Sequence, residues 1–182
     1  MNFVQPIRDL NKIEQLKQVL KHQSDRNYFL FVLGINLGFR ISDLLRLKVM
    51  DIKNREYVVM NEKKNGKPIH LRINPSLRKE INKYVLGKKY NQYLFPSRTG
   101  KGIKPISRVM AYLILSSAGR KVGLGEIGTH TLRKTFAYHF YKKYKDVALL
   151  QKILNHRNQQ ETLLYIGIVQ DIQDEAMNDF SL

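Results

Sequence analysis

Residues 33–47 read LGINLGFRISDLLRL, and this stretch carries the strongest indication of the fold. The segment that leads into it, residues 28–37, is apolar-rich at helical spacing, and Gly38 suits the end of that helix. Leucines in residues 41–47 predict a short further helix. Arg40 is therefore expected at the junction of two helices.

On the N-terminal side, Asn11–His22 has the pattern of an amphipathic helix, with Ser24 or Asp25 available to cap the next helix. On the C-terminal side, Glu56–Met60 and Ile69–Ile73 are rich in β-forming residues. The Asn65-Gly66 pair between these two runs is a strong turn signal. The middle of the chain therefore predicts an antiparallel hairpin.

The second half of the chain has mainly helical patterns. Pro75 opens one helix, and the later helical segments are Ile106–Ala118, Thr131–Tyr144, Val147–Leu154, Glu161–Ile168 and Ile172–Met177. The expected fold class is mostly α with a small antiparallel β-sheet (α+β), in a single domain spanning residues 1–182.

The charge balance indicates a polyanionic partner. Lys and Arg total 32 against 15 Asp and Glu, which gives a net charge of +17 and a pI of about 10.1. Nucleic acid is the leading candidate, an anionic membrane surface is the rival, and a merely solvated cationic face is the third possibility. Because the basic residues are spread along the whole chain, a folded basic surface is favoured over a basic tail.

Several classes of protein are excluded or disfavoured by composition. The chain has no cysteine, which rules out disulfides, a thiolate zinc site and a cysteine nucleophile. The N-terminus lacks the pattern of a signal peptide. The apolar-rich stretch Tyr28–Leu37 falls far short of the roughly 20 residues that a membrane span needs. We expect a soluble cytoplasmic protein with no membrane partner.

Six polar residues stand out by context, although each has an ordinary structural explanation when taken singly. Basic side chains are abundant here, a histidine can cap a helix, and most tyrosines are core residues. Their order and spacing indicate a joint role. The six are Arg40 at the helix junction, Lys64 at the hairpin tip, His130 and Arg133 three apart at a helix start, His156 at a helix end, and Tyr165 nine residues later.

This combination resembles the tyrosine recombinases, or phage integrase family. Residues 33–47 are similar to the family's first-arginine box, and residues 64–67 (Lys-Asn-Gly-Lys) to its lysine turn. Residues 130–137 are similar to the histidine–arginine box. Leu154-Asn155-His156 with Tyr165 completes the pattern, with Asn155 where the family usually has glycine. The resemblance covers roughly residues 10–175 and implies the fold of a DNA breaking–rejoining catalytic domain.

Phosphodiester chemistry explains why two arginines belong in such a site. Nucleophilic attack builds negative charge on the non-bridging oxygens, and planar guanidinium groups can bind two oxygens while keeping their charge. Arg40 and Arg133 are expected to supply this stabilisation. Neither a metal ion nor another cofactor is required, and the sequence has no carboxylate cluster of the kind that holds Mg²⁺.

The resemblance implies the remaining roles. Tyr165 would attack the phosphate and form a 3′-phosphotyrosyl link, with His130 as the base. His156 would donate a hydrogen bond to a phosphate oxygen, and Lys64 would protonate the leaving 5′ oxygen. Lys63 is the alternative to Lys64. Asp43 is expected to orient an active-site side chain, and the alternative is a surface charge on a helix.

The expected activity is site-specific DNA recombination or integration, such as that of a mobile genetic element, on double-stranded DNA at the nucleoid. The alternatives are a truncated, catalytically idle DNA-binding relative and a topoisomerase-like relaxer. The family's N-terminal core-binding domain is expected to be absent, which predicts weak, salt-sensitive DNA binding. Residues 171–182 are expected either to join protomers into a homo-oligomer or to pack on their own domain.

Overall fold

The computed structural model describes residues 4–61, 66, 68–99, 103–125, 127–168, 177–178 and 180. Lys64 and the alternative Lys63 lie outside the described residues, as do the hairpin tip residue Asn65 and most of the expected helix Ile172–Met177. The described part has the expected secondary structure, which is mostly helical with one small antiparallel sheet.

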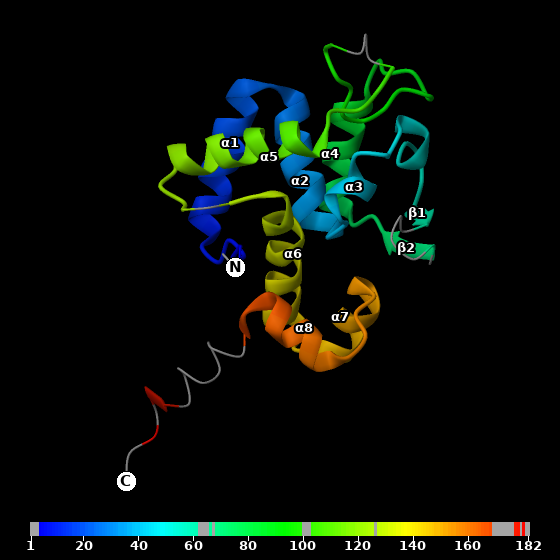
Figure 1. Ribbon diagram of the computed structural model, residues 1–182. Helices are drawn as coiled ribbons and strands as arrows, with labels where there is room; N and C mark the ends of the chain where they lie inside the picture. Colours follow the sequence, from blue (N-terminus) through cyan, green and yellow to red (C-terminus); the bar gives the residue numbers. More distant parts are fainter. Residues whose placement is uncertain are drawn as a thin grey trace.

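Two N-terminal helices, α1 (Leu10–Gln23) and α2 (Asp25–Leu37), form a hairpin around a single polar residue. Ser24 ends α1, since its backbone N–H donates to the Leu20 carbonyl, and it also begins α2, since its hydroxyl accepts from the Asn27 N–H. Ser24 rather than Asp25 is therefore the cap of α2. The apolar surface of α2 is almost wholly buried, which places this helix at the centre of the molecule (Figure 1).

The junction after α2 has the predicted form. Gly38 adopts a left-handed conformation (φ 62°, ψ 20°) and closes α2, and Arg40 is the N-cap of α3 (Ile41–Leu44). The predicted helix 41–47 is too long, because the chain turns after residue 44 and the Leu47 carbonyl accepts from the Leu94 N–H instead. A 3₁₀ turn, η1 (Val49–Asp51), follows.

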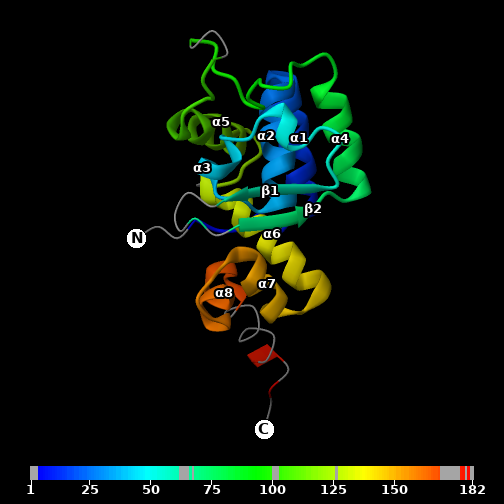
Figure 2. The ribbon, with the colours of Figure 1, turned by 90° about the vertical axis from the view of Figure 1, so that its right-hand side faces the viewer.

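The sheet is the predicted hairpin of β1 (Tyr57–Asn61) and β2 (Pro68–Arg72). Its register pairs Tyr57 with Arg72 and Asn61 with Pro68. The two strands lie at mid-height of the molecule, between the upper helices and α7 (Figure 2).

The helices that follow the sheet complete the upper body and build the lower one. Helices α4 (Pro75–Val85) and α5 (Arg108–Lys121) flank α2 and α1, and the long helix α6 (Thr129–Tyr144) runs downward to α7 (Val147–Leu154) and α8 (Gln159–Ile166) (Figure 1). Asp146 and Asn158 cap α7 and α8 with their side chains.

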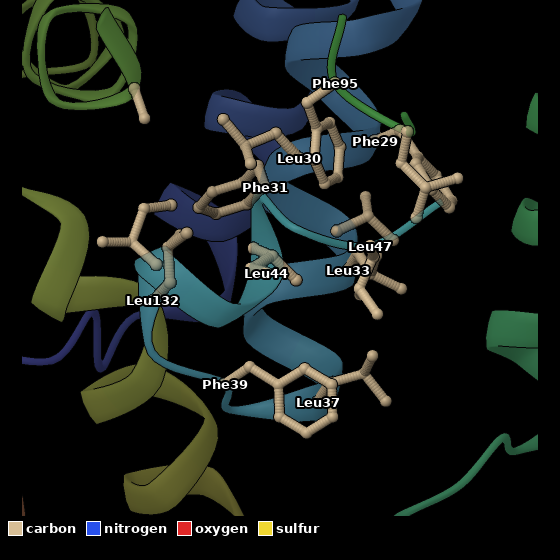
Figure 3. Close-up of a cluster of buried hydrophobic side chains, with 14 of the residues drawn as sticks. Phe29, Leu30, Phe31, Leu33, Leu37, Phe39, Leu44, Leu47, Phe95 and Leu132 are labelled. Atoms are coloured by element: carbon tan, nitrogen blue, oxygen red, sulfur yellow. The ribbon is translucent and has the colours of Figure 1, made fainter. Parts of the chain in front are cut away.

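Buried apolar side chains form two clusters that meet along α6. The larger cluster contains Phe29, Phe31, Phe39 and Leu132 (Figure 3), and the smaller one contains Ala137 together with residues of α7 and α8. Helix α2 packs closely on α6, since a Cβ added to Gly34 would lie 2.6 Å from the Leu132 Cδ1. Helix α6 is thus the rigid link between the two parts of the molecule.

The N-terminal segment forms hydrogen bonds with α6 and with the residue that follows α8. The Ile7 N–H donates to the Thr135 hydroxyl at 2.9 Å, and His139 Nε2 donates to the Ile7 carbonyl at 2.9 Å. Arg8 Nη2 donates to the Gly167 carbonyl, just after α8, at 3.3 Å. Residues at the start of the chain therefore hold both α6 and the end of α8.

None of the helices formed by the described residues has the length and apolar character needed to cross a membrane.

The conformation of Gly38 predicts the effect of a single methyl group. In Gly38→Ala the new Cβ would lie 2.2 Å from the Phe136 Cδ1, in a residue that is already left-handed. We expect the free energy of unfolding, measured by urea denaturation, to fall by about 3 kcal/mol, from the left-handed strain plus the overpacking. Gly87→Ala is the matched control, since Gly87 is also left-handed (φ 73°) but nothing lies within 4 Å of the added Cβ. Equal losses in the two variants would contradict the steric explanation.

Candidate active site

Arg40 is placed by the junction between α2 and α3. Its backbone is extended (φ −62°, ψ 144°), and its carbonyl accepts from the N–H groups of Asp43 and Leu44, each at 2.9 Å. The first turn of α3 therefore fixes the backbone from which the half-buried guanidinium projects.

Arg133 is the most deeply held charged group of the site. It lies on α6 and is only 3% exposed. Its Nη1 donates to the Gly38 carbonyl at 2.8 Å, and its Nη2 donates to the Leu154 carbonyl at 2.5 Å. These carbonyls are at the C-terminal ends of α2 and α7, where backbone acceptors lack helical partners. A single guanidinium therefore joins three helices.

His130 lies one turn before Arg133 on α6 and keeps an exposed side chain. Partial desolvation lowers the pKa of His130 below its ordinary value, and the positive charges of Arg133, Lys134 and Arg40 lower it further. The imidazole is thus neutral at neutral pH and can accept a proton. The hydrogen bond from Arg133 to the Gly38 carbonyl brings the junction that carries Arg40 close to α6.

His156 is held by the turn between α7 and α8. Asn155 ends α7 in the left-handed region (φ 53°, ψ 44°), a conformation that glycine adopts freely and asparagine tolerates. His156 Nδ1 lies 3.1 Å from the hydroxyl of Thr162, and that hydroxyl donates to the Asn158 carbonyl at 3.3 Å. Because the hydroxyl has one proton, which it donates to Asn158, it accepts from Nδ1 of His156.

Tyr165 lies on α8 with its hydroxyl buried. Its ring meets the His156 ring edge-on, with centroids 5.0 Å apart and an interplanar angle of 73°. Burial raises the pKa of Tyr165, while the charges of Arg133 and Arg40 act in the opposite direction. The phenol is therefore protonated at neutral pH, and a base is needed to make it nucleophilic.

The structure brings together every predicted site residue that it describes. Arg133 contacts the ends of α2 and α7, and the charges of Arg133 and Arg40 act on both His130 and Tyr165. The ring of His156 contacts that of Tyr165. Lys64 lies outside the described residues, although both strands of its hairpin are placed.

Asp43 is buried, with 1% exposure, so the reading as a surface charge is wrong. One carboxylate oxygen lies 3.9 Å from Arg46 Nη1. The backbone N–H of Asp43 donates to the Arg40 carbonyl. Its predicted role in orienting an active-site side chain stays a prediction.

Two contributing residues were not foreseen. Thr162 is fully buried and positions His156, and the ammonium of Lys134 lies 5.1 Å from the centroid of the Tyr165 ring. The sequence held one signal for Thr162, since it precedes Tyr165 by three residues and therefore faces the same side of α8. Lys134 carried no signal of its own beside the abundant lysines of this chain.

Within the described part of the chain, no group of three or more His, Asp or Glu side chains could hold a metal ion. The site is instead a set of guanidinium, imidazole and phenol groups. Such a set can bind an oxyanion, remove a proton from the phenol and form a covalent bond through its oxygen.

Comparison with solved structures identifies the fold. The XerA recombinase crystal structure superposes with a TM-score of 0.76 at 20% identity, covering 94% of this chain and 64% of that one. The XerH site-specific recombinase bound to palindromic difH substrate gives 0.75 at 19% identity, covering 98% and 54%. The catalytic domain of bacteriophage HP1 integrase gives 0.67 at 17% identity, covering 96% and 95%. The fold is that of a tyrosine recombinase catalytic domain.

Sequence comparison gives the family. The phage integrase family model matches residues 9–170, and the chain belongs to this family. It is 49% identical to the probable integrase/recombinase YoeC of Bacillus subtilis strain 168, covering 99% of this chain and 98% of that protein. It is 26% identical to the tyrosine recombinase XerA of Pyrococcus horikoshii, covering 94% of this chain but only 60% of XerA.

The contact between Thr162 and His156 predicts the tautomer of the imidazole. In the neutral ring, we expect the proton on Nδ1, where ¹⁵N chemical shifts will detect it. Thr162→Val keeps the shape but removes the acceptor, so this preference should be lost, whereas Thr162→Ser should retain it. The loss of the hydroxyl should also lower the free energy of unfolding by about 1–2 kcal/mol, as a buried hydrogen bond is broken. An unchanged tautomer in Thr162→Val would contradict this assignment.

Proposed function

We propose that this protein cleaves and rejoins DNA strands at specific sites through Tyr165, by way of a 3′-phosphotyrosyl intermediate. One observation carries the proposal: the Tyr165 phenol is packed with His156 and lies in the field of Arg133 and Arg40, in a chain of the phage integrase family. The named relatives include tyrosine recombinases, which is the activity proposed here.

Double-stranded DNA is the proposed partner. The net charge of +17 calls for a polyanion, and the solved neighbours include XerH bound to difH substrate and a lambda integrase dimer bound to a core site. With this partner, we propose a location in the cytoplasm at the nucleoid. We also propose that residues 1–182 form a single catalytic domain.

Arg40 and Arg133 would bind the non-bridging oxygens of the scissile phosphate. Arg133 uses one N–H on each of Nη1 and Nη2 for the Gly38 and Leu154 carbonyls. A guanidinium has five N–H groups, so these two carbonyls do not use all of its donors. The arginine is held rigidly by the protein, which is the preorganisation that transition-state stabilisation requires.

In the proposed reaction, the phenol oxygen of Tyr165 forms a bond to phosphorus while the bond from phosphorus to the 5′ oxygen breaks. The proton of Tyr165 passes to His130, and Lys64 (or its alternative Lys63) protonates the leaving oxygen. His156 would donate from Nε2 to a phosphate oxygen, which requires the doubly protonated imidazolium because Nδ1 donates to Thr162. The transition state carries more negative charge than the phosphodiester, and this negative charge favours the imidazolium form of His156.

The C-terminal segment, residues 171–182, is proposed to join protomers in a homo-oligomer. Two of its described residues, Met177 and Phe180, are 69% and 64% exposed, which leaves apolar surface for a partner to cover. A lambda integrase structure that this fold resembles is a dimer bound to a core site. This part of the proposal is independent of the cleavage chemistry.

A covalent adduct is the direct test of the nucleophile. The protein is incubated at low salt with a pool of random nicked duplexes, in which cleavage is trapped because the short strand diffuses away. We expect an adduct on a denaturing gel that is absent in Tyr165→Phe. Tyr144→Phe is the matched control, since Tyr144 is an exposed tyrosine with Lys143 over its ring, and it should form the adduct normally.

DNA binding is measured in parallel by fluorescence anisotropy. Tyr165→Phe should bind the pool as the unmodified protein does, because the hydroxyl is buried. Binding by the unmodified protein without any adduct would sink the cleavage proposal and leave a catalytically idle DNA-binding relative in its place.

The lowered pKa of His130 sets the acid limit of the reaction. A histidine with a lowered pKa stays neutral below pH 6.5, its ordinary pKa, and loses its function as a base only as the pH falls through the lowered value. The rate of adduct formation should therefore hold through pH 6.5 and fall at more acidic pH. His130→Gln should be slow at every pH, whereas His22→Gln, which alters an exposed histidine of α1, should keep the profile. An acid limb above pH 6.5 would refute this assignment.

A further inference from the structure

Lys134 is an unusual lysine for this chain. It is 7% exposed, whereas lysines are almost never fully buried unless a partner compensates. It directly follows Arg133 on α6, and its ammonium lies over the Tyr165 ring, 5.1 Å from the centroid. Burial lowers the pKa of Lys134 from its ordinary value, which shows that the charged form is held at a cost.

The Tyr165 ring is bounded from two sides by different elements. Lys134 from α6 lies over its face, and His156 from the turn between α7 and α8 meets it edge-on at 5.0 Å. Helix α8 supplies the tyrosine itself. The ring is thus confined between groups that belong to separate parts of the backbone.

A neutral apolar side chain would fill the position of Lys134 without the desolvation cost. The same helix offers a comparison, since Lys143 Nζ lies 5.3 Å from the centroid of the Tyr144 ring, in a pair that is exposed to solvent. In an exposed pair the desolvation cost of the cation is small, and the contribution of the contact to stability is also small. In the Lys134–Tyr165 pair the distance is similar, 5.1 Å, but the lysine is buried. The attraction between a cation and a ring is stronger in such a desolvated setting.

We propose that Lys134 is a positioning residue for the nucleophile: its ammonium holds the Tyr165 ring in place and favours the phenolate form. This inference rests on the proposed function of Tyr165. The charges of Arg133 and Arg40 lower the pKa of Tyr165 against the effect of burial, and the ammonium of Lys134 lies over the face of the ring. Ionisation of the phenol spreads negative charge into the ring, so the attraction to Lys134 increases in the reactive form.

Among the described residues, the charged or titratable groups around this assembly include Arg133 and Arg40, His156 at the ring edge and His130 on α6. His130 is affected by the charge of Lys134, which lowers the pKa of His130. Loss of the lysine charge therefore has two expected effects. The pKa of Tyr165 rises, and the pKa of His130 moves back toward its ordinary value.

Three variants of the full chain test the proposal. Lys134→Met removes the charge and retains most of the side-chain length, and Lys134→Arg retains the charge. Lys143→Met is the matched control, because it removes the same charge and the same kind of ring contact from the same helix. Thermal unfolding of each variant confirms that it is folded, and we expect Lys134→Met to fold because it relieves a buried charge.

The first readout does not depend on DNA. In protein labelled with ¹³Cζ-tyrosine, the Tyr165 signal is assigned by its loss in Tyr165→Phe and is followed as the pH is raised. In Lys134→Met, Tyr165 should ionise at a pH higher by about one unit, which corresponds to roughly a tenfold loss of phenolate at neutral pH. In Lys134→Arg and Lys143→Met it should titrate as in the unmodified protein.

The second readout is the rate of adduct formation on the nicked duplex pool. Lys134→Met should be slower by roughly tenfold at neutral pH, matching the loss of phenolate, and the deficit should shrink as the pH rises. Lys134→Arg should recover most of the rate. A merely structural role would lower the rate equally at every pH and would leave the titration of Tyr165 unchanged.

The two readouts separate the failure of this inference from that of the proposed function. If the unmodified protein forms no adduct, the cleavage proposal fails, and the titration of Tyr165 still decides whether Lys134 acts on it. If Tyr165 titrates identically in Lys134→Met and Lys143→Met, the inference about Lys134 is overturned whatever the adduct assay shows. A higher ionisation pH in Lys134→Met alone supports it.

Discussion

The buried guanidinium of Arg133 is the interaction on which the arrangement of this protein depends. It reaches from α6 to the last carbonyls of α2 and α7, and so ties the upper cluster of apolar side chains to the lower one at the point where the site lies. A charged group that is 3% exposed is tolerable only with such partners. The helix ends supply them because their carbonyls lack partners within the helix. The hydrogen bonds to Gly38 and Leu154 thus both position the Arg133 guanidinium and compensate for its burial.

Many of the excess basic side chains of this protein lie over aromatic rings. Carboxylates are outnumbered, with 15 against 32 Lys and Arg, so many cations cannot have a carboxylate partner. Within the described part of the chain, nine tyrosines instead have a Lys or Arg over the ring. A ring face attracts a cation weakly and leaves it charged. The surface therefore stays strongly basic, as an electrostatic attraction to a polyanion requires.

The features that could be predicted from sequence are those with local causes. The end of α2 at Gly38, the hairpin around Asn65-Gly66 and the start of α6 each follow from a few neighbouring residues. The true length of α3 could not be predicted, because it depends on pairing of Leu47 with Leu94, far along the chain. Site residues were found through the spacing of motifs. Thr162 and Lys134 were missed because their importance comes from contacts that exist only after α6, α7 and α8 have packed.

The hydrogen bonds of the N-terminal segment have a consequence for the order of folding. Ile7 contacts Thr135 across 128 residues of sequence, and Arg8 contacts Gly167 across 159. Contacts of such long range form late, because a large loop must close before they are gained. During synthesis, the segment after α8 cannot meet Arg8 until nearly the whole described chain has left the ribosome. An incomplete chain therefore lacks the hydrogen bond that holds the end of α8 to the N-terminal segment.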